Sequence, residues 1–114
     1  MKCLIGASGL GDWWIYTIES VQSEEKADHL AWSLACEQYE SYVGSYGIRY
    51  EETIMEEEDC SYEEASDIFQ EEREQSIEYW ISFDIENKIN ELLKKGSIDS
   101  TKEIQNYEKW KNQD

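Results

Sequence analysis

Carboxylates are the most abundant reactive side chains in this sequence. The chain has 114 residues, of which 27 are Asp or Glu and 10 are Lys or Arg, so its formal net charge is −17. Carboxylates can transfer protons, bind divalent cations or attract the basic surface of a partner. Because acids are so numerous, their spacing and the residues around them have to decide between these three uses.

The spacing of the reactive residues matches no catalytic or metal-binding motif. Residues 56–59 are four consecutive acids, but the alternating D-x-D-x-D-G pattern of a calcium loop is absent. His29 is the single histidine, so neither a histidine metal site nor a catalytic triad is expected. Cys3, Cys36 and Cys60 form no C-x-x-C pair and have no basic cluster beside them. We therefore predict a protein that is not an enzyme, with no metal site and no cofactor.

A glycine-rich segment at residues 6–11 has to be compared with nucleotide-binding and hydrolase motifs. G-x-S-x-G fails because residue 10 is Leu, G-x-G-x-x-G fails because residue 14 is Trp, and the G-K-[ST] of a P-loop is missing. The segment separates apolar residues 2–7 from residues 13–21, where β-branched and aromatic side chains dominate. This pattern predicts a β-hairpin with a glycine-rich turn.

The rest of the chain, which contains no proline, is typical of helices. Residues 23–43 begin with Ser23 as a good N-cap, precede Gly44 and are apolar over most of the helix circumference, which predicts a buried central helix. Further helices are expected within residues 50–58, 84–95 and from Ser100 onward. The sequence thus predicts an α+β fold, with one domain over residues 1–96 and a C-terminal helix that frays over residues 97–114.

Two interpretations are open for the segment that follows Ser61, which begins with a capping box completed by Glu64. We prefer one helix over residues 62–82, because apolar residues continue at helical spacing. In the alternative, the helix ends near Gln75 and residues 77–83 form a third strand, because apolar residues also alternate there.

Aromatic residues divide into two groups by periodicity. Those at regular spacing are expected to form the core, namely Trp14, Tyr16, Trp32, Tyr39, Trp80 and Phe83. The less periodic ones are candidates for exposure to a partner, because Tyr and Trp are favoured anchors in protein interfaces; they are Trp13, Tyr46, Tyr50 and Trp110.

The acids are concentrated in residues 51–83, which hold 13 acids and 1 base. On the preferred helix, one face carries a row about 22 Å long, opposite the apolar face, formed by Glu63, Asp67, Glu71, Glu74 and Glu78. Glu56, Glu57 and Glu58 flank this row. An acidic helix face is ordinarily solvated surface, but like charges at i, i+4 cost about 0.2–0.5 kcal/mol per pair. A row that keeps this repulsion with few bases nearby indicates a functional anionic surface.

Small size, high acidity and an acid row on a helix resemble the DNA-mimic inhibitors encoded by phages and plasmids, of the anti-restriction and anti-CRISPR types. The resemblance lies in composition and in the acid row, and no motif carries it. It implies a non-enzymatic inhibitor that occupies the basic nucleic-acid groove of a host CRISPR effector or restriction enzyme. The alternative is a small acidic adaptor or homo-oligomer that uses exposed aromatics.

The charge and the N-terminus narrow the expected partners and compartment. A net charge of −17 disfavours direct binding to nucleic acid or anionic membrane. The N-terminal segment lacks the apolar stretch of roughly 7–15 residues of a secretory signal, and no apolar run approaches the ~18 residues of a membrane span. The expected location is the host bacterial cytoplasm, where unpaired cysteines are common.

Overall fold

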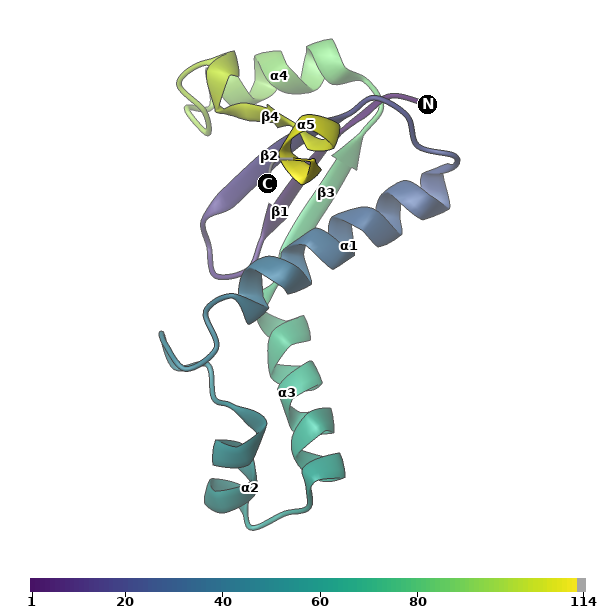
Figure 1. The fold of residues 1–114 in the computed structure, drawn as a ribbon. Coiled ribbons are helices and arrows are strands. Elements are labelled where there is room, and N and C mark those ends of the chain that lie inside the picture. The colour runs from purple at the N-terminus through teal and green to yellow at the C-terminus, as the bar shows by residue number, and fades with distance from the viewer. Residues whose placement is uncertain (113–114) are drawn as a thin grey trace.

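A four-stranded sheet joins segments from both ends of the chain in the computed structural model, which describes residues 1–112 (Figure 1). Its strand order is β3-β1-β2-β4. The strands are β1 Cys3–Ser8, β2 Trp13–Ile18, β3 Glu78–Ser82 and β4 Ile104–Asn106. β1 pairs antiparallel with both β2 and β3, whereas β4 runs parallel to β2. The α+β class and the N-terminal hairpin are therefore confirmed.

Helices cover both faces of this sheet and also extend beyond it. The helices are α1 Glu24–Glu40, α2 Glu51–Glu58, α3 Tyr62–Ser76, α4 Ile85–Lys94 and α5 Tyr107–Lys111, with a 3-10 turn at Thr101–Glu103. α1 packs on one face and α4 on the other, whereas α2 and α3 project away as a helical pair (Figure 1). We call residues 51–76 the arm.

The arm makes the molecule longer than a compact chain of this size. The described chain has a radius of gyration of 16.4 Å and principal extents of 50 × 30 × 28 Å. A compact chain of 114 residues has a radius of gyration of about 13 Å. Within residues 1–112, no helix combines the length and the apolarity that a membrane crossing requires.

The strands alternate between two apolar cores, as a period of two dictates. Tyr16 and Ile18 of β2 pack in the core beneath α1, whereas Ile15 packs in the core beneath α4. The glycine-rich turn docks on the end of α1, where Gln38 accepts a hydrogen bond from the Gly9 amide at 2.7 Å and donates one to the Asp12 carbonyl at 3.0 Å. The glycines of this turn therefore allow its tight geometry and its close packing against α1.

α1 lies close to the sheet because its inner face carries small residues. Ala27, Ala31 and Ala35 are fully buried, and the Ser23 side chain accepts from the Lys26 amide as the predicted N-cap. The helix ends at Glu40, earlier than the predicted end at Val43. The chain already turns there, because the Tyr42 and Val43 amides bond the carbonyls three residues earlier and Gly44 has a φ of 89°.

The preferred helix over residues 62–82 is wrong in its last part. α3 ends at Ser76, and Glu78–Ser82 is the strand β3, as in the alternative interpretation. β1 supplies the reason, because its free edge gains a partner: Ile81 pairs across from Ile5, and Trp80 pairs across from Gly6. Backbone pairing and burial on the sheet outweigh the local helical spacing, as tertiary context does for short apolar runs.

The helix expected from Ser100 is also replaced by other structure. The capping box between Ser100 and Glu103 forms, but it opens only the three-residue 3-10 turn. Residues 104–106 then join the sheet as β4, with Ile104 opposite Ile15. Asn106 caps the short helix α5 that follows. Residues 113 and 114 of the expected helix lie outside the described part of the chain.

The aromatic residues are less buried than predicted. Tyr16 and Tyr39 are buried as expected, and Trp32 and Trp80 are half-buried. Trp14 and Phe83 remain 38% and 39% exposed, contrary to the core prediction. Trp13, Tyr46 and Tyr50 are exposed as partner candidates require, whereas Trp110 packs against the Tyr16 ring.

Gly6 provides a test of how β3 packs on the sheet. A Cβ at this position would lie 2.2 Å from the Trp80 indole, so Gly6→Ala should cost about 1–3 kcal/mol of unfolding free energy by overpacking. In a Trp80→Ala background the collision is gone, and the same substitution should be neutral or stabilising, because Ala suits a strand better than Gly. Urea denaturation of the wild type, the two single variants and the double variant measures the coupling energy between residues 6 and 80. Equal costs of Gly6→Ala in both backgrounds would show that Trp80 does not cover Gly6.

Candidate functional site

The arm is held together by a thin apolar core between its two helices. Ile54 of α2 and Ala65 of α3 are fully buried, and Phe69 is 8% exposed and packs its ring edge-on to Tyr39 of α1. Asp59 ends α2 in the left-handed conformation with a φ of 50°, which lets the chain reverse before Ser61 caps α3. The two helices therefore lie side by side (Figure 1).

Arg49 clamps the end of α2 to α3. Its Nη1 lies 3.2 Å from a Glu58 carboxylate oxygen and 3.7 Å from one of Glu57, and its Nη2 donates to Glu72. These hydrogen bonds raise the pKa of the Arg49 guanidinium above its ordinary value. One base from outside the arm therefore compensates three of its acids.

Arg73 joins the arm to the rest of the described chain, residues 1–50 and 77–112, which we call the body. Its guanidinium lies 2.8 Å from Glu40 of α1 and 3.4 Å from Glu74, and it stacks over the Trp32 ring at 5.5 Å. The Trp32 indole N–H donates to both carboxylate oxygens of Glu74, at 3.0 and 3.2 Å. Glu74 is thus a structural residue at the junction of α1 and α3.

The structure brings together only part of the predicted acid row. Glu63, Asp67 and Glu71 are exposed on α3 and make no ion pair within the described residues. Glu74 belongs to the junction with α1, and Glu78 lies in β3, so it is not part of a helical row. The row therefore has three members at i, i+4 and i+8. We call these three residues the α3 row.

The flanking acids of α2 also divide into residues that form ion pairs and a residue that does not. Glu57 and Glu58 face the Arg49 guanidinium, whereas Glu56 is exposed and makes no ion pair within residues 1–112. The predicted partner residues did not include Tyr62, the first residue of α3, which is 57% exposed. Its position directly after the N-cap, where few residues face the core, is the signal that could have found it.

The arm carries most of the net charge of the protein. It holds 12 acids and one base, a net charge of −11 within a total of −17. Its single base, Arg73, and the neighbouring Arg49 are both engaged in ion pairs. The exposed face of α3 therefore presents negative charge without local compensation, and its field weakens as ionic strength rises.

The remaining metal-ligating and nucleophilic side chains form no cluster in the described part of the chain. No group of three or more His, Cys, Asp or Glu side chains in residues 1–112 is arranged to hold a metal ion. Cys3 and Cys36 are buried. Burial raises the pKa of the Cys36 thiol to about 11, so this group is protonated at neutral pH.

Arg49→Gln should loosen α2 while the sheet stays intact, because the substitution removes the clamp and leaves three acids facing one another. The Arg49 side chain is 23% exposed, so solvent screens the pairs, and we expect a local loss of about 1.4 kcal/mol. Amide hydrogen exchange in α2 should then be about tenfold faster. Lys95→Gln, which breaks an exposed pair with Glu91 in α4, is the control and should leave α2 unchanged. Unaltered exchange in Arg49→Gln would show that Arg49 does not hold α2 against α3.

Comparison with known proteins gives no relative for this chain. A scan against protein-family models, a search of curated proteins and a search of solved structures each found no match. Any function has to be inferred from the charge and geometry of the surfaces described above.

Proposed function

We propose that this protein is a non-enzymatic inhibitor whose arm occupies the basic nucleic-acid groove of a host defence enzyme. The observation that carries the proposal is the α3 row on a projecting helix, Glu63, Asp67 and Glu71, without cationic partners in the described chain. The target class, a CRISPR effector or a restriction enzyme in the bacterial cytoplasm, comes from the resemblance to phage and plasmid inhibitors.

The shape of the arm supports this role. Successive members of the α3 row are about 6 Å apart along the helix axis, and two packed helices form a rod about 20 Å across. Such a rod is similar in width to a nucleic-acid duplex. A groove built to hold nucleic acid presents Lys and Arg, which attract carboxylates as they attract phosphates.

The rigidity of the arm also supports the proposal. Arg49 fixes α2 to α3, and Arg73 with Trp32 fixes α3 to α1. The carboxylates are thus positioned before binding, so little conformational entropy is lost when a partner engages them. Tyr50, directly before the arm, and Tyr62, within it, are 54% and 57% exposed and supply aromatic anchors near the acids.

One observation favours a second candidate, a protein-interaction adaptor or homo-oligomer. Tyr46 is 79% exposed and has a φ of 54°, so the loop between α1 and α2 holds an aromatic ring out into solvent. Its ring packs only edge-on to Tyr42, with centroids 5.4 Å apart. An interface centred on such rings would depend on apolar burial, and its affinity would change little with salt.

Glu63→Gln/Asp67→Asn/Glu71→Gln should weaken inhibition while the protein remains folded, because these side chains make no internal ion pair among the described residues. Each lost rim contact is worth about 0.5–1 kcal/mol at low salt, so binding should fall at least about tenfold. The measurement is competition for a fluorescent DNA duplex, with a panel of purified CRISPR effectors and restriction enzymes. Wild-type competition should weaken steeply as salt is raised.

The matched control neutralises the same number of acids outside the arm. Glu25→Gln/Asp28→Asn/Glu86→Gln removes three exposed carboxylates and also leaves a net charge of −14. It should compete within about threefold of wild type. If the arm variant competes as well as wild type at low salt, or wild type displaces DNA from no member of the panel, the inhibitor proposal fails. Tyr46→Ala/Tyr50→Ala then tests the aromatic interface.

A further inference from the structure

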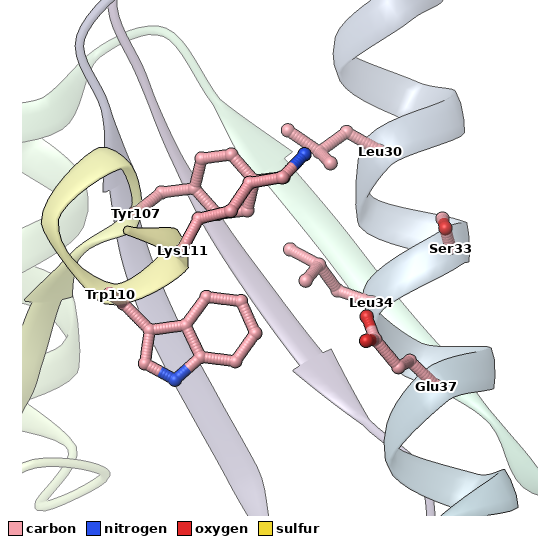
Figure 2. Close-up of a pocket in the computed structure, with 7 residues that line it drawn as sticks. All are labelled: Leu30, Ser33, Leu34, Glu37, Tyr107, Trp110 and Lys111. Carbon is pink, nitrogen blue, oxygen red and sulfur yellow. The ribbon is translucent and has the colours of Figure 1, made fainter. Parts of the chain in front are cut away.

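A groove runs between α1 and α5 over the surface of β2. Its larger part has a volume of about 520 Å³ and lies between Leu30, Ser33, Leu34 and Glu37 on α1 and Tyr107, Trp110 and Lys111 on α5 (Figure 2). A smaller cavity of about 190 Å³ adjoins it and shares Leu34, Glu37 and Trp110. Trp14 and Tyr16 of β2 line this smaller cavity as well. This groove is separate from the α3 row.

Aromatic rings form one side of the groove. The Tyr16 ring lies 5.3 Å from the Trp110 ring and 6.3 Å from the Tyr107 ring, measured between centroids. Trp14 stands on the same face of β2 and is 38% exposed. The faces of such rings attract cations, and Trp attracts them most strongly.

The chain itself places a cation at the larger end of the groove. The Lys111 ammonium lies over the Tyr107 ring, 5.5 Å from its centroid. Figure 2 shows this ammonium pointing toward Leu30, whereas the Glu37 carboxylate lies farther along α1, beyond Leu34. Glu37 is exposed and makes no ion pair within residues 1–112, so the smaller cavity has a negative group and no cation from the described chain.

A buried tyrosine lies beside the same cavity. Tyr16 is only 1% exposed, and its hydroxyl has no hydrogen-bond partner among the described residues. Burial, together with the charge of Glu37, raises the pKa of Tyr16 to about 12, so the hydroxyl is neutral and can accept or donate. The hydroxyl oxygen is fully buried, so a ligand in the cavity does not reach it, and Tyr16 contributes its ring, which packs against Trp110.

We propose that the smaller cavity binds a primary ammonium or guanidinium group on an aliphatic stem. The N–H groups donate to the Glu37 carboxylate, the Trp14 and Trp110 rings contact the cation, and the stem packs on Leu34. An anion is disfavoured by Glu37 and by the net charge of −17. A neutral group would leave the carboxylate unpaired. The inference does not depend on the proposed function of the arm.

The probes are a blocked lysine and a blocked arginine, each an N-acetyl methylamide, with cadaverine as a free amine. The readout is the indole N–H signals of the protein by NMR during titration. The signals of Trp14 and Trp110 should shift to saturation, while those of Trp13 and Trp80, which lie toward the opposite face of the sheet, should stay fixed. The blocked norleucine, which has the stem without the charge, should bind at least about tenfold more weakly.

Single substitutions test each contact. Glu37→Gln should weaken binding about tenfold or more. Tyr16→Phe should change binding less than about twofold and should not lower thermal stability, because it removes a buried hydroxyl that has no partner in the described structure. Glu25→Gln, on the same helix away from the groove, should change binding less than twofold. Retention of amine binding by the arm variant Glu63→Gln/Asp67→Asn/Glu71→Gln separates this site from the proposed function.

The outcomes also identify the source of the cation. Tighter binding of a blocked residue indicates a Lys or Arg side chain of a protein partner, and tighter binding of cadaverine indicates a free amine; both support the cation site. Equal binding of norleucine and lysine, no binding of any probe, or an unchanged affinity in Glu37→Gln would overturn it.

Discussion

The ion-pair network around Arg73 is the interaction on which the shape of this protein depends. The guanidinium contacts Glu40 at the end of α1 and Glu74 near the end of α3, and it covers the Trp32 ring. Without this group, two carboxylates from different helices would face each other beside an indole, in a region where acids already predominate. The Arg73 guanidinium therefore neutralises the repulsion between these carboxylates and fixes the orientation of the arm relative to the body.

Charge and apolar burial are distributed over different parts of the molecule. The body has two cores, one on each face of the sheet, and contains nearly all of the fully buried residues. The arm has only a narrow core around Ile54 and Ala65 but holds 12 of the 27 acids. As a result, the α3 row and the groove between α1 and α5 face solvent from separate elements.

Local signals in the sequence predicted the elements that depend on neighbouring residues. Ser23 and Ser61 cap helices where expected, and the glycine-rich turn forms as a hairpin. The sequence could not place β3 and β4, because both owe their conformation to pairing with strands distant in the chain. The same holds for Glu74 and Glu78, which helical spacing places in one exposed row. The Trp32 indole that donates to Glu74 and the strand β1 that pairs with Glu78 are both distant in the chain.

The arm is an insertion between two parts of one structure. Glu40 and Arg73 are in contact where the chain leaves α1 and where it returns to β3, so the sheet is complete without the residues between them. Exposed positions of α2 and α3 can therefore change with little effect on folding of the body. Substitutions there can alter the surface charge of the arm while the pairing and the two cores of the sheet stay the same.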